Sequence, residues 1–497
     1  MFKNIIVGLA VLCSVLSLSS CEDFGDMNDD PNRATTTHPQ LQLTKIEWDA
    51  FREFGGTAPL YATKMLIQTD GENANQYYKW DRGSFGQYGN LRDITKMAEE
   101  AERIGDDSYI ALAKFFRAYY FYNLTLTFGD IPYSQALQAE ADQQQVSPAY
   151  DDQKAVFAGI LAELAEANEI LKSSNSIIAG DIIYQGRTDK WRKLVNAFRL
   201  KVLLTLSKRT AESDMNVTSA FASILQNEPI MLSEDDNAQL IFLNQEGNRY
   251  PEFNSSGFGS GMYMDSTFIK RLQDRQDPRL FIYSTQTKLA KESGKAINDF
   301  SSYEGGDPAA PYAQVNLKAA EGKVSKVNER YYQDPTAEPR IVLGFAEQQF
   351  ILAEAAARGW INQDAAAYYA QGVKASFKFY QTYAKGYEQY VSEAAAQIYL
   401  QRPVNNFSAA LTTEEKIEKI NMQKYLQSYF QAGWTVFYDH LRTGYPSFRR
   451  SAGVAIPFRW IYPQSEYNFN GSNVSEAIRK QFGEGKDQIN QPTWWLK

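Results

Sequence analysis

The chain has 497 residues and a net charge of -8, with 59 acidic side chains against 51 lysine and arginine side chains. No block rich in lysine or arginine interrupts this acidic balance, which argues against nucleic-acid binding. The two histidines, His38 and His440, are too few for a histidine-rich metal site or for most general-base schemes. Aromatic residues make up 14% of the chain, a content that fits either core packing or surfaces on which sugars or peptides stack.

An apolar segment near the start of the chain predicts export. Lys3 precedes an almost continuously apolar run at 5–18, a layout typical of a secretory signal and too short for a stable transmembrane span. The run ends in LSSC at 18–21, which resembles the lipobox of bacterial lipoprotein signals. In such signals the cysteine becomes the first residue of the mature protein and its sulfur carries a diacylglycerol. We therefore expect residues 1–20 to be a signal peptide and Cys21 to be lipidated; the alternative is an ordinary secreted protein with a stray cysteine.

The remaining cysteine, Cys13, lies inside this signal. A mature chain without it has no free thiol and no internal disulfide, which excludes cysteine catalysis and cysteine-ligated zinc. A long exported chain can fold without such a crosslink, because its core is large enough.

The segment that follows, residues 21–40, is polar and acidic, and we expect it to form a tether that leads away from a membrane. From Asp26 it briefly resembles a calcium-binding loop. Pro31 stands where the turn glycine is needed and Thr37 where the bidentate glutamate is needed, so an EF-hand is rejected. We expect no cofactor; a structural calcium ion held by loop carboxylates is compatible with the sequence but cannot be read from it.

The rest of the chain, residues 41–497, is predicted to be a single all-α domain. Apolar residues recur there at threes and fours, as in amphipathic helices. Six long helices are predicted, at 108–128, 153–172, 189–208, 341–358, 363–384 and 413–432. Their arrangement in pairs and their alanine content favour a tetratricopeptide-like scaffold, although the strict period of that repeat is not kept.

The middle of the chain, residues 228–338, has a different composition, with many Gly, Asp, Asn, Ser and Pro residues. We predict a loop-rich insertion with only a short helix near 265–275. The stretches NSSGFGSGMYMDS at 254–266 and SSYEGGDPAAPYAQ at 301–314 are predicted to be long loops, which in compact proteins are usually functional or disordered. The glycines at 257–261 lack the spacing of a nucleotide-binding fingerprint.

Six blocks rich in aromatic and alanine residues follow one another along the chain. They are AKFFRAYYFYNLTLTFGDIPYSQAL (113–137), DKWRKLVNAFRLKVLLTLSK (189–208), AEQQFILAEAAARGW (346–360), GWTVFYDHLRTGYP (433–446), IPFRWIYPQSEYNFN (456–470) and NQPTWWLK (490–497). In this order they resemble the motifs of SusD/RagB-type nutrient-binding lipoproteins, most closely the SusD-like branch. We expect Trp191, Phe350 and Tyr462 to be packing residues. Arg442, Arg459 and Glu466 are expected to form structural ion pairs.

This resemblance implies a SusD-like fold and a location on the cell surface, anchored by lipid to the outer membrane of Bacteroidota. Such proteins capture an oligosaccharide, or in some relatives a peptide, and close as a lid on a SusC-like TonB-dependent transporter. No bond is made or broken, so we expect a binding protein and not an enzyme. Three alternatives stay open: a peptide-binding member, a structural lid that recognises no ligand, and a surface glycoside hydrolase, which needs two facing carboxylates.

Ligand-binding residues are expected in an aromatic stretch near the region where starch-binding relatives place theirs. Sugar rings stack on aromatic faces, and their hydroxyls need amide or carboxylate partners. The candidates in this stretch are Asn75, Tyr77, Tyr78, Trp80 and Asp81. Trp80 is predicted to face outward; the alternative is that these rings fill the gap between two helices. Tyr303 and Tyr312 are further candidates in the middle of the chain.

Overall fold

The structure is a computed structural model that describes residues 37–52, 56–139, 146–174, 176–408, 410–431 and 433–497. The expected signal peptide, Cys21 and most of the acidic tether lie outside the described residues, so those predictions stay predictions. The last residues of the tether belong to a helix, which begins at Pro39. In the part of the chain that the structure describes, no helix combines the length and the apolar character needed to cross a membrane.

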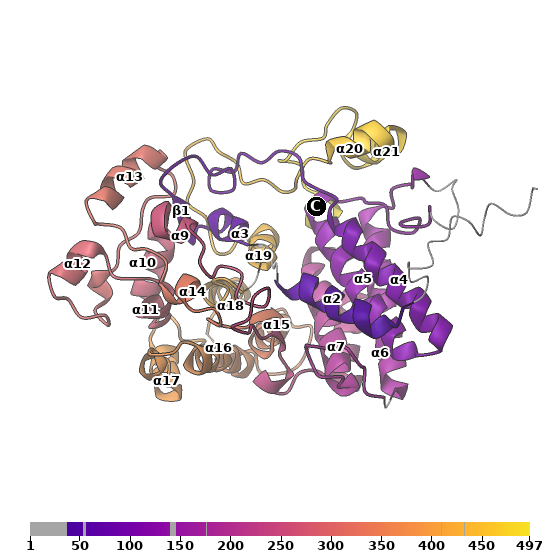
Figure 1. Ribbon diagram of the computed structural model, residues 1–497, viewed down its shortest axis with the longest axis horizontal. Coiled ribbons are helices and arrows are strands. Elements are labelled where there is room, and N and C mark those ends of the chain that lie inside the picture. Colours follow the sequence, from indigo (N-terminus) through magenta and orange to yellow (C-terminus); the bar gives the residue numbers. More distant parts are fainter. Residues whose placement is uncertain (1–36, 53–55, 140–145, 175, 409, 432) are drawn as a thin grey trace, which may run out of the picture.

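The N-terminal half forms a stack of helices at one end of the molecule, on the right in Figure 1. Its helices are α2 (Pro39–Arg52), α4 (Gln87–Ile104), α5 (Asp107–Phe128), α6 (Gln153–Ser173), α7 (Thr188–Thr205) and α8 (Val217–Asn227). Helix α5 begins where the Asp106 carboxylate accepts a hydrogen bond from the Ser108 amide, 3.0 Å away. It ends at Gly129, whose φ of +95° favours glycine. Neighbouring helices in this stack pack against each other through one continuous apolar core.

The second helical stack lies beside the first, in the lower middle of Figure 1. It contains α15 (Phe345–Ala357), α16 (Ala365–Tyr383), α17 (Glu393–Gln401), α18 (Thr413–Gln427) and α19 (Thr435–Thr443). A reciprocal capping box between Thr412 and Glu415 starts α18. Helices α15 and α16 pack closely side by side, and α19 lies between the two ends of the molecule (Figure 1).

The mostly helical architecture confirms the predicted fold class. Each of the six predicted helices is present; 189–208 runs three residues past the end of α7 at Thr205, and two other boundaries differ more. The prediction 341–358 includes a strand, because the β-branched run at Arg340–Leu343 pairs with Ala238–Leu240 before the helix begins. The prediction 413–432 continues past the end of the helix at Gln427. Helix pairs α4–α5, α6–α7 and α15–α16 pack together, and their likeness to tetratricopeptide units stays a prediction.

Residues 228–338 hold more regular structure than predicted. The helix expected near 265–275 is α10 (Ser266–Asp274), which Asp265 caps. Besides two short 3-10 helices, the other elements of this part are β2 (Ala238–Leu240), α9 (Gly257–Ser260), β3 (Met262–Met264), α11 (Arg279–Tyr283), α12 (Lys288–Glu292), α13 (Tyr312–Ala320) and α14 (Arg330–Gln333). Strand β3 pairs with β1 (Leu66–Gln68), which follows α3 (Ala58–Ala62). These elements are too short to show a periodicity, so they were predicted as loops.

The C-terminal segment joins the two ends of the molecule. It runs beside the N-terminal segment that precedes α4, along the upper edge of Figure 1. The Gly83 amide donates a hydrogen bond to the Ile461 carbonyl (2.8 Å), and the Ile461 amide donates one to the Asp81 carbonyl (3.1 Å). Beyond α20 (Gln464–Phe469) and α21 (Gly471–Phe482), the chain returns to α6, where Trp495 is fully buried. This return places C-terminal tryptophans next to N-terminal helices.

Candidate functional site

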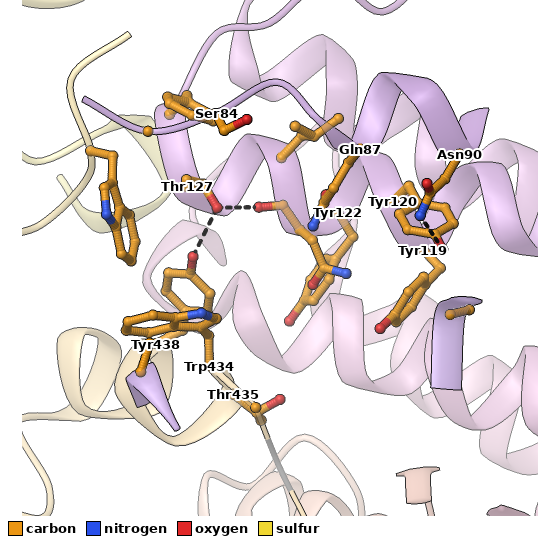
Figure 2. Close-up of a pocket in the computed structure, with 18 of the residues that line it drawn as sticks. Ser84, Gln87, Asn90, Tyr119, Tyr120, Tyr122, Thr127, Trp434, Thr435 and Tyr438 are labelled. Atoms are coloured by element: carbon orange, nitrogen blue, oxygen red, sulfur yellow. Dashed lines mark hydrogen bonds between the residues drawn. The ribbon is translucent and has the colours of Figure 1, made fainter. Parts of the chain in front are cut away.

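A cavity of about 500 Å³ lies between the N-terminal helices and the beginning of α19. Helices α4 and α5 form one wall, and α19 together with the C-terminal segment forms the other (Figure 2). We call this cavity the interhelical pocket. Side chains from Asp49 to Trp460, more than four hundred positions apart along the chain, meet in it, because the C-terminal segment lies back across the N-terminal one.

Two half-buried tryptophans, Trp434 and Trp460, line the interhelical pocket. Their ring centroids are 4.8 Å apart and their planes are nearly perpendicular. Behind them lies Trp80, which stacks on Trp460 with centroids 3.6 Å apart and an angle of 15° between the planes. Trp80 also meets Trp434 edge to face, at 5.5 Å. The buried indole therefore holds the two lining indoles in place, and the pocket has a preformed aromatic wall.

Helix α5 supplies tyrosines to the opposite wall. Its aromatic residues occur at adjacent positions, so rings lie both toward the core and toward the interhelical pocket. The Tyr120 hydroxyl accepts a hydrogen bond from the Asn90 side chain (2.8 Å), and the Tyr122 hydroxyl pairs with Thr205 Oγ1 (2.9 Å). Burial raises the pKa of Tyr120 and of Tyr122, so both phenols stay neutral and can donate or accept hydrogen bonds.

A hydrogen bond links the two walls at the end of the pocket nearest Trp434. The hydroxyls of Thr127 and Tyr438 lie 3.1 Å apart, and Thr127 also donates to the Asn123 carbonyl at 2.7 Å (Figure 2). This contact connects α5 with α19 and fixes the width of the pocket at that end.

The polar groups of the interhelical pocket are almost all neutral. Asp49 is the one carboxylate among the described lining residues, and it is paired with Lys45 at 2.6 Å. The other polar lining side chains are amides and hydroxyls: Asn75, Gln87, Asn90, Asn123, Ser84, Thr127 and Thr435. Amides and hydroxyls offer both donors and acceptors, which matches the hydroxyl groups of a sugar. The pocket thus combines aromatic faces with neutral hydrogen-bonding groups.

The sequence matches the family model described as starch-binding and associating with the outer membrane, over residues 31–463. The chain belongs to the SusD-like family. This SusD-like protein is 56% identical to a SusD homologue from Bacteroides fragilis, across 93% of this chain and 100% of that chain, with a TM-score of 0.88. It is 54% identical to an outer membrane protein of Bacteroides vulgatus assigned to nutrient binding, with the same coverage of 93% and 100% and a TM-score of 0.90.

A structure named only as a chitin-binding protein shares the fold, with 23% identity, 93% and 100% coverage and a TM-score of 0.74. The comparison with curated proteins gives no match. These findings confirm the predicted family and the SusD-like helical fold. They place the protein in a starch- and nutrient-binding family of the outer membrane.

The structure does not bring the seven predicted ligand residues of this SusD-like protein together. Asn75 lines the interhelical pocket. The prediction that Trp80 faces outward is wrong, because its side chain lies behind Trp460 and only 7% of the residue is exposed. Tyr78 is also buried, and its hydroxyl donates to the Ala62 carbonyl at 2.7 Å. Tyr78 and Trp80 are therefore packing residues, as the alternative interpretation of this stretch expected.

The other candidates lie apart from the interhelical pocket. Tyr77 donates a hydrogen bond to the Ala310 carbonyl (2.9 Å), close to Tyr312, which is 37% exposed at the start of α13. Tyr303 is buried, with its hydroxyl bonded to the Ile297 carbonyl at 2.7 Å. Asp81 is exposed beside the C-terminal segment. The role of these positions in ligand binding stays a prediction.

Sequence reasoning missed Trp434, Trp460 and the tyrosines of α5. Each lies in a block that carried the family resemblance, where the aromatic residues were interpreted as packing or boundary residues. The one signal available was the pair of adjacent tyrosines, Tyr119 and Tyr120, which point to different sides of a helix. Among the residues that the structure describes, no group of His, Cys, Asp and Glu side chains is arranged to hold a metal ion.

Proposed function

We propose that this SusD-like protein captures oligosaccharides at the interhelical pocket and delivers them to a transporter in the outer membrane. The observation that carries the proposal is the pairing of two half-buried indoles, Trp434 and Trp460, with neutral amides and hydroxyls on the facing wall. Sugar rings stack on indoles through their C–H groups, while their hydroxyls bond to amides. Asn75 contacts the ligand in this proposal, and Trp80 positions the rings that stack on it.

The cellular setting of the proposal follows from the family. Lipidation at Cys21 anchors the protein to the outer face of the outer membrane, with the acidic segment after it acting as the tether. The protein then closes over a SusC-like TonB-dependent transporter as a lid. The bound sugar is not hydrolysed, because hydrolysis needs two facing carboxylates and Asp49 is the one carboxylate among the described lining residues.

Replacing Trp434 with alanine is expected to weaken oligosaccharide binding by about five- to thirtyfold, roughly 1–2 kcal/mol, because one stacking face is removed. Trp460→Ala is expected to have an effect of the same size. Isothermal titration calorimetry against starch- and chitin-derived oligosaccharides measures both. The matched control is Trp360→Ala, which removes another half-buried tryptophan at a distance from the pocket, beside Phe221.

Unchanged affinity of both variants for every oligosaccharide that the wild type binds would remove the interhelical pocket from the binding site. Binding of peptides but of no oligosaccharide would favour the peptide-binding alternative. Co-purification with a transporter but no binding of either ligand would indicate a structural lid, and turnover of any oligosaccharide would establish a hydrolase.

A further inference from the structure

A second hollow, of about 720 Å³, lies between α10 and the loop at 447–455, and three arginines line it. Arg271 comes from α10, and Arg449 and Arg450 come from the loop. We call it the arginine hollow. Behind it lies Phe448, which is buried against His440 with ring centroids 4.4 Å apart. The hollow is open to solvent, so its charged walls are accessible from outside.

Two of the three arginines have no carboxylate partner among the residues that the structure describes. Arg449 is neutralised by Asp307 through two hydrogen bonds of 2.7 and 2.6 Å. Arg450 Nε donates to the Val454 carbonyl at 2.7 Å, and Arg271 Nη2 donates to the Ser447 carbonyl. Within the described ranges, neither Arg450 nor Arg271 forms an ion pair. Carbonyl groups orient a guanidinium but leave its positive charge uncompensated.

The position of Arg271 leaves part of its hydrogen-bonding capacity unused. Its guanidinium carbon lies 5.0 Å from the centre of the Tyr425 ring, and its Nη1 is buried with no hydrogen-bond partner in the described part of the chain. The buried carboxylate Asp265 accepts hydrogen bonds from the Thr267 amide and hydroxyl, both at 2.6 Å. An unsatisfied charged donor is costly, and this cost falls when an anion binds nearby.

The arginines of the hollow also affect the pKa values of the groups beneath it. Burial lowers the pKa of His440 to about 4, and Arg450 and Arg271 act in the same direction. Burial also lowers the pKa of Lys64; Asp265 opposes this shift and Arg450 adds to it. Two arginines without a carboxylate partner in the described residues, Arg450 and Arg271, thus lie with a neutral histidine around one opening, and the field there favours an anion.

We propose that the arginine hollow binds an oxyanion, a uronic acid carboxylate or a sulfate ester, carried by the captured oligosaccharide. The guanidinium fork matches the two oxygens of such a group and gives it directional hydrogen bonds. The loop that lines the hollow continues directly to Trp460, so one segment borders both the hollow and the interhelical pocket. That the oxyanion belongs to a sugar rests on the proposed function. That the bound group is negatively charged rests on the arginines.

The test compares three ligands by isothermal titration calorimetry: trigalacturonate, the same oligomer after reduction of its carboxyl groups, and a sulfated oligosaccharide. Wild-type protein is expected to bind one of the two charged ligands at least about tenfold more tightly than the reduced one. The preference for carboxylate or sulfate identifies the source of the charge. Arg450→Gln is expected to abolish the preference and to leave binding of the reduced oligomer unchanged, and added salt is expected to weaken only the charged ligand.

Arg479→Gln is the matched control, because Arg479 is an exposed arginine on α21, paired with Glu476. It is expected to keep the preference. Arg271→Gln tests the arginine that α10 contributes and is expected to weaken the preference as well. Its thermal unfolding is measured alongside, since this side chain packs on Tyr425. Equal binding of charged and reduced ligands by the wild type, or an unchanged preference in Arg450→Gln, would overturn the proposal of an oxyanion site but not the proposed function. Failure of all three ligands to bind would overturn the proposed function together with it.

Discussion

Arg442→Met is expected to lower the free energy of unfolding by about 3 kcal/mol, because it leaves a buried carboxylate without its main partner. Arg442 on α19 and Glu354 on α15 are both buried, and Arg442 Nη2 lies 2.8 Å from Glu354 Oε2. The same nitrogen lies 2.9 Å from Asp439. After the substitution, Glu354 keeps Arg358, which approaches from the surface at 2.7 Å, and a hydrogen bond of 3.3 Å from the Asn421 side chain. The ion pair joins two helices of the second stack, so its loss affects their packing.

The effect depends on pH. Burial by itself raises the pKa of Glu354, but Arg442, Arg358 and Lys424 together lower it below its ordinary range. A carboxyl whose folded-state pKa is depressed contributes stability that is present above its unfolded pKa and is lost as the pH falls through the folded value. The penalty of Arg442→Met is therefore expected to be full at about pH 7 and to shrink below about pH 4.5, where the unfolded carboxyl is protonated.

Urea unfolding at several pH values measures this prediction. Arg479→Met is the control, because its partner Glu476 is exposed and the pair is screened by solvent; it is expected to leave the midpoint unchanged. A midpoint for Arg442→Met equal to that of the wild type at neutral pH would contradict the structural role given to this pair. The sequence-based expectation of ion pairs is confirmed for Arg442 and for Arg459, which pairs with Asp487. It was wrong for Glu466, which forms no ion pair within the described part of the chain and accepts a hydrogen bond from Tyr150 (2.7 Å).

Trp80→Ala is expected to destabilise the fold by about 3–5 kcal/mol, the usual cost of deleting a buried aromatic side chain. Trp80 contacts Trp460 and Trp434, and its ring centroid lies 4.9 Å from that of Phe437. Its removal leaves a cavity behind the aromatic wall, so oligosaccharide affinity is expected to fall as well, because Trp460 loses the ring on which it stacks. Trp80→Phe retains part of this support and is expected to recover part of both losses.

Trp434→Ala separates stability from binding. Trp434 is half-buried at the pocket, so its truncation is expected to cost less stability than Trp80→Ala while weakening binding. Chemical unfolding and calorimetric titration of the two variants make the comparison. A Trp80→Ala protein with wild-type stability and no oligosaccharide binding would contradict the buried, supporting role and would favour direct contact between Trp80 and the ligand.

The sequence was most informative about its long helices and its family. Helix α5 was predicted to within one residue of its start, because its apolar spacing, the Gly129 stop and Pro132 act locally. Apart from α10, the short helices and strands of residues 228–338 were not predicted, since a helix of one or two turns shows no period and is held by caps and neighbours. The strand at Arg340–Leu343 was taken as part of a helix because its partner, β2, lies about a hundred residues earlier.

By itself the sequence determined an acidic, mostly helical SusD-like chain, because composition, periodicity and motif order are properties of neighbouring residues. Only the tertiary structure decided which aromatic residues are available to a ligand. Trp80, Trp434 and Trp460 are the same residue type, and the residues around them in the sequence do not show which indole is buried and which ones line the pocket. Their roles differ because the C-terminal segment lies across the N-terminal one, covering Trp80 and leaving the other two indoles at the pocket.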